Sequence, residues 1–548
     1  MKKIKYISAV FIAAFLFIAC NKQIEEKQPD PNNPTSVPPN LILGTVLTDM
    51  SGTGSQGSLG GINSWDNVQD WNQYHCQNYD YYGNNIYSWA NGSYDPYLVI
   101  KNVLKMDSEW TSRGGEAVNA YEAVGRFIIA YYYYNLTSLF GDVPLTDALQ
   151  GAKNFSPAYT PQAQVFAYIL GQLDTANTHL AGLIAKGDNS LSSTQDIYYG
   201  GDLTKWQKLV NSFKLRVLIS LSNQASDATL NVPAQFAAII NNPSQYPIFS
   251  DQNSAADPKM KADDFAFVYN PGGSNVYSTY PFNPSNFGSI AGRFNMAYTY
   301  VHALTSLSDP RVFVTCEPAS ALMGNDPNPC QYAFFAGAST GEPVQTMYGN
   351  ANAGLYSFIN RKRYYSDFTG EPNVLVGYKE MCFNIAEGIA RGWVAGNAED
   401  WYKKGITESM SFYGIDVTKT NFTAYFLPAG ANSVTQVQPY PYNFDFNVYY
   451  AQPSVKYSST TATAINQIVL QKYIACFENS GYEGYYNWRR TGTPAFQTGA
   501  GVGNNGIVPV RWAYPVSEQT QNKANWTSAL SSQGFAADDL NQAMWLLK

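Results

Sequence analysis

The sequence predicts a mainly α-helical protein built from tetratricopeptide-like helix pairs joined by long irregular loops. Apolar residues recur at three- and four-residue steps through about 96–245 and 373–414, the pattern of amphipathic helices. Successive stripes start about 35 to 45 residues apart, which is the span of helical-hairpin repeats, although the full tetratricopeptide consensus is absent. The segments at about 249–365 and 422–459 are rich in Asn, Ser, Gly, Pro and Tyr, and they predict loops.

The expected helices follow one another along the chain. Thr160 followed by Pro161 predicts a helix start, with a capping residue and a proline at the first helical position. Asn397 can cap a helix that follows the stripe ending at Trp393. Further helices are expected at 465–478 and near 536–547. The first three stripes consist of Tyr121, Val124, Ile128, Tyr132, Asn135 and Leu139; of Val165, Ile169, Leu173, Ala176 and Leu180; and of Trp206, Leu209, Val210, Phe213, Val217 and Leu221.

The N-terminus has the pattern of an export signal. Three lysines among the first five residues precede an apolar run that ends at Ala19, and this run is too short to cross a bilayer stably. The four residues FIAC at 17–20 resemble a bacterial lipobox, which predicts that Cys20 is acylated and anchors the protein to a membrane. We therefore expect a signal peptide at 1–19, a lipidated Cys and a flexible, Pro-rich tether at 20–40, and a single helical domain at 41–548.

The composition favours binding surfaces made of aromatic rings. Charged residues make up 14% of the chain and aromatic residues 15%, with 42 Tyr and 11 Trp. Tyr and Trp offer a flat apolar face and a polar tip, so they suit both cores and sugar-binding or peptide-binding surfaces. The formal net charge of −7 provides no basic field for phosphates, which argues against nucleic acid as a partner.

The five cysteines after Cys20 show no CxxC spacing, so neither a zinc site nor a disulfide framework is indicated. Cys316 and Cys330 flank one loop and leave a disulfide open in an oxidising compartment. The chain has three histidines and lacks the HExxH, GxSxG and P-loop motifs, so we expect no catalytic site, metal or cofactor. Carboxylates far apart in sequence can still meet in space, which leaves a glycosidase open.

One aromatic segment, at 65–89, interleaves Trp and Tyr with Asn, Gln and Asp. Rings stack on the C–H faces of sugars while amides and carboxylates bond the hydroxyls, so this mixture predicts a glycan site. The residues around Gly83 are expected to lie in a loop, and replacing Tyr82 or Trp89 by Ala is expected to weaken binding without changing the thermal midpoint. The candidate ligand-binding residues are Tyr81, Tyr82, Asn84, Asn85 and Trp89, with Tyr277 and Tyr280 as second-rank candidates from the mid-chain loop.

Several segments, in the same order along the chain, resemble the SusD/RagB family of nutrient-binding lipoproteins, in its SusD-like branch. They include the NLTSLFGDVPLTDAL motif, in which Gly141 and Pro144 end a helix, and the closing GYEGYYNWRRTGTP. The residues of these motifs are expected to hold the fold, because Arg489 and Arg490 can cap helices or pair with buried acids. The resembling segments lie at 30–43, 135–149, 206–223, 378–392, 471–494 and 508–522.

The resemblance implies tetratricopeptide-like helix pairs whose long loops carry the ligand site. It also implies a lipid-anchored protein at the outer membrane of a Bacteroidetes-type bacterium, facing the exterior. Such a protein binds a glycan and delivers it to a SusC-like TonB-dependent transporter, without catalysis. A peptide-binding member of the family, a helical glycoside hydrolase or lyase, and a periplasm-facing scaffold for proteins remain as alternatives.

Overall fold

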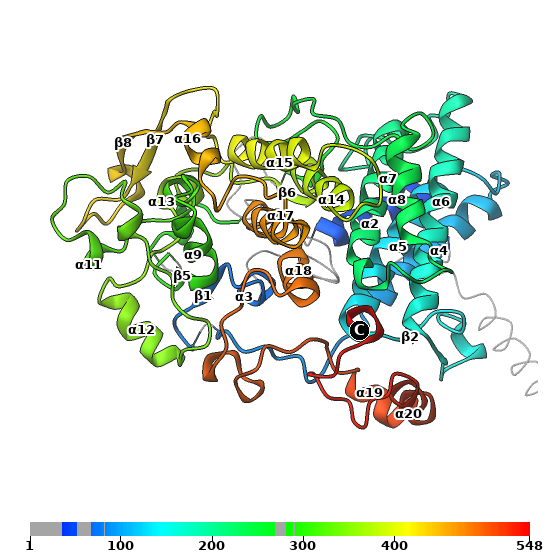
Figure 1. Ribbon diagram of the computed structural model, residues 1–548. Coiled ribbons are helices and arrows are strands. Elements are labelled where there is room, and N and C mark those ends of the chain that lie inside the picture. Colours follow the sequence, from blue (N-terminus) through cyan, green and yellow to red (C-terminus); the bar gives the residue numbers. More distant parts are fainter. Residues whose placement is uncertain (1–35, 52–66, 82, 269–280, 289–290) are drawn as a thin grey trace, which may run out of the picture.

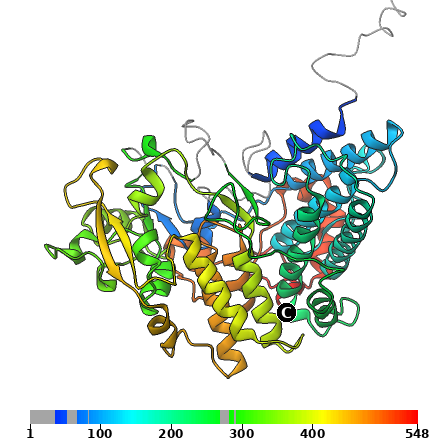
Figure 2. The ribbon, with the colours of Figure 1, turned by 90° about the horizontal axis from the view of Figure 1, so that it is seen from above.

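The computed structural model describes residues 36–51, 67–81, 83–268, 281–288 and 291–548. The protein is mainly helical with short strands, which confirms the predicted fold class. Helical pairs lie at one end of the molecule and the hairpin of β7 (Asn421–Phe426) and β8 (Gln438–Asn443) at the opposite end, with further helices between them (Figures 1 and 2). In the described part of the chain, no helix combines the length and the apolar character that crossing a membrane requires.

Six helices form a helical lobe at one end of the molecule, and each packs against the next one along the chain. The predicted stripe on 121–139 is present, but nearly every residue of its helix is buried because other segments cover its remaining faces. The helices of the helical lobe are α2 (Pro39–Ser51), α4 (Pro96–Ser112), α5 (Ala120–Phe140), α6 (Gln162–Ala185), α7 (Leu203–Ser220) and α8 (Val232–Asn241).

Four further helices occupy the middle of the molecule (Figure 1). Helix α14 (Tyr378–Ala390) packs against α15 (Ala398–Phe412) and α17 (Thr461–Ala475), and also against α7 of the helical lobe. The layer of long helices therefore extends past the predicted region at 373–414 and includes 461–491. These central helices are α14 (Tyr378–Ala390), α15 (Ala398–Phe412), α17 (Thr461–Ala475) and α18 (Glu483–Thr491).

The remaining lobe contains the two segments expected to be loops, and we call it the loop-rich lobe. It holds several short helices, which lack the turns needed to show a periodic apolar pattern in sequence. Cys316 and Cys330 are both buried here as free thiols, so the open question of their disulfide is answered in the negative. The short helices are α9 (Tyr298–Ser306), α10 (Val312–Thr315), α11 (Ser320–Met323), α12 (Val344–Asn352), α13 (Arg361–Tyr365) and α16 (Phe446–Ala451).

Four two-stranded antiparallel sheets connect segments, some of them far apart in sequence. In the β7–β8 hairpin, Pro439 and Pro441 lie opposite Tyr425 and Thr423. Prolines lack the N–H that a further strand would need, so they protect this edge against strand addition. The paired strands are β1 (His75–Gln77) with β5 (Phe294–Met296), β2 (Val143–Pro144) with β3 (Tyr159–Thr160), β4 (Phe265–Phe267) with β6 (Asn373–Val376), and β7 (Asn421–Phe426) with β8 (Gln438–Asn443).

Side-chain caps start the long helices. Asn397 accepts a hydrogen bond from the backbone N–H of Glu399 and caps α15, as predicted. The prediction for α6 was wrong in detail, because its first residue is Gln162 and Thr160 belongs to β3. The backbone N–H of Gln162 donates instead to Asp142, at 2.8 Å. The acid that follows α5 thus satisfies the start of α6.

Buried ion pairs join the central helices to their neighbours. Arg216 of α7 donates to both oxygens of Glu380 on α14, at 2.7 and 2.5 Å. Glu387 of α14 pairs with Arg490 of α18. The predicted structural role of Arg490 is therefore confirmed, since its partner is a fully buried acid. Buried pairs of this kind fix the register of helices because an unpaired buried charge is costly.

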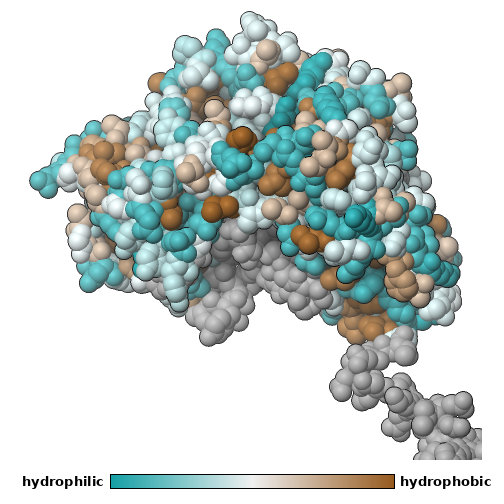
Figure 3. All heavy atoms as spheres, turned by 90° about the horizontal axis from the view of Figure 1, so that it is seen from below, coloured by the Kyte–Doolittle hydropathy of each residue, from teal (hydrophilic) through white to brown (hydrophobic). Residues whose placement is uncertain are grey.

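The C-terminal segment returns to the helical lobe, where α19 (Val516–Gln521) and α20 (Lys523–Ser532) lie near β2 (Figure 1). The backbone N–H of Leu546 donates to the Gln162 side chain at 2.9 Å, and Leu546 is buried. The helix expected near 536–547 is only a single 3-10 turn at Trp545–Leu547. On the face in Figure 3, coloured apolar residues are scattered among polar ones and do not gather into one continuous patch.

Candidate ligand-binding site

The aromatic segment at 67–89 is held by a buried polar network. Asp70 accepts hydrogen bonds from the Gln77 amide at 2.8 Å and bonds the His75 ring at 2.7 Å. Strand β1 continues from this network and pairs with β5 of the loop-rich lobe. The network leaves the residues after β1 at the edge of that lobe, where side chains can reach solvent.

Trp89 lies in the core. Its side chain has no exposed surface, and its ring meets Tyr485 and Trp71 edge-on at centroid distances of 4.9 and 5.2 Å. A sugar cannot stack on a ring whose faces are covered by other rings. The structure therefore assigns Trp89 to packing, which corrects the expectation that it contacts ligand.

The two predicted amides also have structural roles. Asn85 is buried and exchanges two hydrogen bonds with the backbone of Gln77, at 2.9 and 3.0 Å. The side chain of Asn84 accepts from the N–H of Ile86 at 3.0 Å. Both amides thus stabilise the loop around Gly83. Tyr82, Tyr277, Tyr280 and the lipidation residue Cys20 lie outside the described residues.

Tyr81 is the predicted residue that the structure presents to solvent, with 83% of its surface exposed. Its ring centroid lies 6.4 Å from that of Tyr79, which in turn lies 5.4 Å from Tyr348 of α12. The guanidinium of Arg293 lies 4.2 Å from the centre of the Tyr79 ring. We call these four residues the tyrosine patch. Its rings are adjacent and partly open to solvent, as stacking on a sugar requires.

Sequence reasoning noted Tyr79 as part of the aromatic segment but did not choose it as a site residue. It missed Tyr348 and Arg293 because both lie more than 200 residues further along the chain. The β1–β5 pairing brings Arg293 to Tyr79, since Asn78 N–H donates to the Arg293 carbonyl at 3.0 Å. No spacing rule could have shown this contact.

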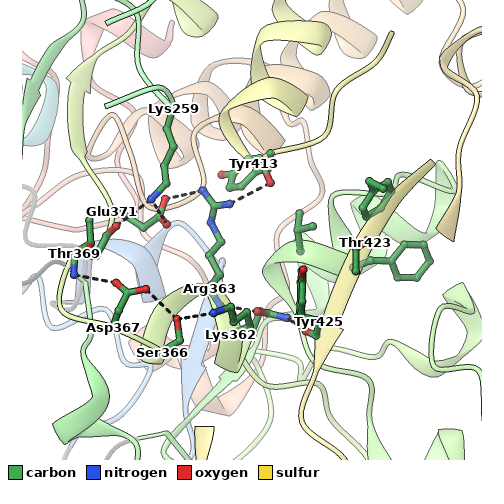
Figure 4. Close-up of a pocket in the computed structure, with 16 residues that line it drawn as sticks. Lys259, Lys362, Arg363, Ser366, Asp367, Thr369, Glu371, Tyr413, Thr423 and Tyr425 are labelled. Carbon is green, nitrogen blue, oxygen red and sulfur yellow. Dashed lines mark hydrogen bonds and ion pairs between the residues drawn. The ribbon is translucent and has the colours of Figure 1, made fainter. Parts of the chain in front are cut away.

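A separate pocket of about 430 Å³ lies in the loop-rich lobe between α13, the loop at 366–371 and strand β7 (Figure 4). Arg363 lies at its centre and donates to Glu371 at 2.7 Å and to the carbonyls of Phe412 and Tyr413, each at 3.1 Å. Lys259 donates to the same Glu371 carboxylate at 3.1 Å. We call this the Arg363 pocket. Two cations fix Glu371 as a paired carboxylate in its wall.

A third hollow of about 690 Å³ lies beside β8 and α16 and is lined by tyrosines. Several of its polar groups bond one another: the Tyr442 hydroxyl donates to that of Tyr332 at 3.2 Å, and Tyr449 bonds the buried Asp309 at 2.5 Å. Asp445 caps α16. Because these groups already have partners, this hollow offers a ligand less than the Arg363 pocket does.

Carboxylates that stand next to another acid in the sequence, such as Asp263 and Glu399, have structural partners. Asp263 accepts from Lys208 and Ser250, and Glu399 pairs with Lys403. Asp264 is buried, which raises its pKa to about 6 even though it accepts the backbone N–H groups of Tyr378 and Lys261. Within the described ranges, no group of three His, Cys, Asp or Glu residues could hold a metal ion.

Comparison with known proteins shows the family to which the chain belongs. The model of a SusD-like family, described as starch-binding and associating with the outer membrane, matches residues 31–515. The chain belongs to this SusD-like family. The predicted resemblance is thereby confirmed over nearly the whole chain. A search of curated proteins gave no match.

Solved structures agree with the SusD-like assignment. A SusD homologue from Bacteroides fragilis is 28% identical, covers 94% of this chain and 100% of its own, and has a TM-score of 0.72. An outer membrane protein from Bacteroides vulgatus, described as probably involved in nutrient binding, is 27% identical with coverages of 93% and 100% and a TM-score of 0.73. A chitin-binding SusD homologue from Flavobacterium johnsoniae, at 17% identity, coverages of 93% and 98% and a TM-score of 0.67, shares the fold.

Proposed function

We propose that this SusD-like protein binds oligosaccharides at the outer face of the outer membrane and delivers them to a SusC-like TonB-dependent transporter, without catalysing a reaction. The tyrosine patch is the observation that supports binding: two adjacent tyrosines follow β1, and a third ring and a guanidinium come from distant segments. The family description as starch-binding and associated with the outer membrane supports a glycan as the ligand class.

Stacking on sugar rings is the physical basis of this proposal. Each pyranose presents an apolar C–H face, and an exposed tyrosine ring buries that face while the sugar hydroxyls stay hydrated or bond nearby polar groups. The Tyr81 ring is 83% exposed, and covering an exposed aromatic face with a sugar removes apolar surface from water. The patch is shallow, so we expect micromolar to millimolar affinity for a single oligosaccharide.

The test is calorimetric titration with neutral oligosaccharides that include malto- and chito-oligosaccharides. The latter are included because two structures with this fold are described as chitin-binding. Tyr81→Ala and Tyr348→Ala are expected to weaken binding about fivefold or more while the thermal midpoint changes little. The control is Tyr298→Ala, a 39%-exposed tyrosine that stacks on His302 outside the patch. Unchanged affinity in both patch variants would remove the patch from the proposal.

The proposed attachment of the protein to the outer membrane depends on the acylation of Cys20. Replacing it with Ala is expected to move the protein from the membrane fraction to the soluble fraction, because stable anchoring needs the acyl chains. Protease added to intact cells should digest the wild-type protein if it faces outward. Protection from protease would favour the periplasm-facing scaffold, and a pull-down without a barrel partner would contradict delivery to a transporter.

The two alternative functions make different predictions. A glycoside hydrolase or lyase would generate new reducing ends during prolonged incubation with a bound oligosaccharide, whereas a binding protein returns it intact. A peptide-binding member would retain peptides and no oligosaccharide. Either result would replace the proposal.

A further inference from the structure

We propose that the Arg363 pocket is a second carbohydrate site and that it takes an acidic sugar, with the uronate carboxylate bound by Lys362. This inference rests on the proposed function, because it concerns the class of glycan that the protein binds. It concerns a place in the molecule separate from the tyrosine patch. No residue is shared between the two sites.

The charge of the pocket selects for an anion. Its lining contains Lys259, Lys362 and Arg363 but only two carboxylates, Asp367 and Glu371. The whole chain carries a formal net charge of −7, so an excess of positive charge here runs against the average of the molecule. A cluster of cations around a hollow raises the local concentration of anions.

The pairing within the pocket leaves Lys362 available. Glu371 already accepts from both Lys259 and Arg363. Lys362 is exposed, and among the described residues its ammonium forms no ion pair; its nearest bonded partner is the Ser366 hydroxyl at 3.5 Å. A carboxylate placed beside this ammonium would gain a charge-assisted hydrogen bond, which is stronger than a neutral one.

The rest of the lining suits a pyranose ring. Tyr425 of β7, 40% exposed, and Thr423 on the same strand line one side of the pocket, and the Lys362 ammonium lies beside Ser366 of the loop at 366–371 (Figure 4). Thr369 and Asp367 belong to the same loop as Ser366, and the exposed Asp367 carboxylate, which accepts from the Ser366 hydroxyl and the Thr369 N–H, can also accept from sugar hydroxyls. A ring that stacks on Tyr425 could therefore direct hydroxyls to one rim and its carboxylate to Lys362. The volume falls within the range of small-ligand pockets.

The walls of the pocket are fixed before any ligand binds. The Asn360 side chain donates to the Tyr425 carbonyl at 2.9 Å and accepts from the Arg363 N–H at 2.9 Å, so it joins α13 to β7. Arg363 makes three further bonds to the pocket wall. A site with pre-set walls binds more tightly because less conformational freedom is lost on binding.

The experiment is calorimetric titration of the full-length mature protein with tetrasaccharides of galacturonate, glucuronate and mannuronate, and with their neutral carboxyl-reduced counterparts. We expect at least one uronate to bind and its reduced counterpart to bind about tenfold more weakly. Raising the salt from 50 to 500 mM is expected to weaken only the uronate, because salt screens exposed charge pairs.

The variants locate the site. Lys362→Gln is expected to weaken uronate binding by about threefold to tenfold, and Tyr425→Ala by a similar factor. The matched control is Lys153→Gln, an exposed lysine on a 3-10 turn in a different part of the molecule, which should leave affinity unchanged. Tyr81→Ala should leave uronate binding in the pocket unchanged while it weakens neutral oligosaccharides.

Three outcomes would overturn the proposal. They are the absence of binding by any uronate, equal uronate affinity in wild-type and Lys362→Gln protein, and binding of an acidic peptide through Lys362 without any uronate. Failure of the proposed function would differ, because neutral oligosaccharides would then also fail to bind and the tyrosine-patch variants would have no effect.

Discussion

At the scale of single residues, exposure separates the rings that can hold a ligand from those that hold the fold. Trp89 and Tyr81 lie eight positions apart in one aromatic segment, yet Trp89 is fully buried and Tyr81 is 83% exposed. Trp89 is enclosed by Tyr485 and Trp512, with centroids at 4.9 and 5.6 Å. Ring–ring contacts of this kind add to the stabilisation that burial already gives.

Trp89→Ala is expected to destabilise the protein by about 3 to 5 kcal/mol, because it opens a large cavity in the core. Chemical denaturation followed by fluorescence measures this change. The control is Tyr81→Ala, which should stay within about 0.5 kcal/mol of wild type. Equal stability of the two variants would contradict the assignment of Trp89 to the core.

The sequence could not separate these two rings. Two of the rings that enclose Trp89, Tyr485 and Trp512, lie about 400 residues away in the chain, so no local pattern reports its complete burial. The same holds for Asn85, whose amide bonds the backbone of Gln77 across a turn. Composition singles out this segment as a candidate, but only the fold shows which side chains of the segment reach solvent.

Glu387 gives a residue-scale prediction about pH. Burial alone would raise the pKa of this carboxyl, but the charges and hydrogen bonds of Arg490 and the charge of Arg391 outweigh burial and lower it to about 2. The free value is about 4.3. The pair therefore stabilises the folded state above about pH 4.3, and this stabilisation is lost as pH falls from there toward 2.

Glu387→Gln should destabilise the protein at pH 7 by about 3 to 5 kcal/mol, since it leaves Arg490 buried without its counter-charge. The difference from wild type should shrink as the pH falls below about 4. Urea denaturation at pH 7 and pH 3 checks both statements. Glu399→Gln, in an exposed pair with Lys403, is the control and should change little at either pH.

At the scale of elements, one buried acid connects α13 to the β7–β8 hairpin. Glu317 accepts from the backbone N–H of Arg361 at 2.7 Å and from that of Leu427 at 3.0 Å. Burial raises its pKa to about 7. The two elements that it connects both line the Arg363 pocket. By bonding both of them, the Glu317 side chain holds these two walls of the pocket at a fixed separation.

Glu317→Ala is expected to leave both N–H groups without a partner and to loosen the hairpin, at a cost of about 2 to 4 kcal/mol. Hydrogen exchange should quicken at Leu427 and Arg361 while α5 and α6 keep their protection. Glu342→Ala, at a half-exposed acid bonded to Tyr356, is the matched control. Unchanged exchange at Leu427 would contradict this role of Glu317.

Element by element, prediction succeeded where helices are long. The stripes on 165–180 and 206–221 coincide with α6 and α7 because four or more turns repeat the apolar pattern. It failed at 249–365, where the helices have four to nine residues and the chain follows non-local contacts. The end of α5 was read correctly from Gly141, which has a φ of +92°, a conformation that favours glycine.

At the scale of the whole molecule, the C-terminal residues pack into the core of the helical lobe, whose helices come from the first half of the chain. Met544 has no exposed surface and its sulfur lies 3.2 Å from the Gln162 amide nitrogen. The Gln224 side chain donates to the carbonyl of Trp545 at 2.6 Å. The last residues therefore close the helical lobe between α6 and α7.

Leu546→Ala and Met544→Ala are each expected to destabilise the protein by about 2 to 5 kcal/mol and to lower hydrogen-exchange protection in α6. The control is Asn541→Ala, at an exposed residue of the same segment, with an expected change within about 0.5 kcal/mol. If α6 kept its full protection in Leu546→Ala, the C-terminal segment would be an attachment with no part in the core.

Segments from late in the chain bury α5, so this helix is fully covered only near the end of synthesis. The Tyr134 hydroxyl donates to Glu483, which lies 349 positions further along the chain, at 2.8 Å. The Phe140 ring stacks on the Tyr514 ring. Neither contact can form until the later residue has been synthesised. At about 5 to 20 residues per second, the ribosome needs roughly 20 to 70 s to supply Glu483 after Tyr134. Within the run Tyr131–Tyr134, Tyr133 contacts the early rings of Tyr97 and Tyr168, whereas Tyr134 also packs against Tyr486. The nascent chain therefore leaves the Tyr134 side of this run partly uncovered until the final helices emerge.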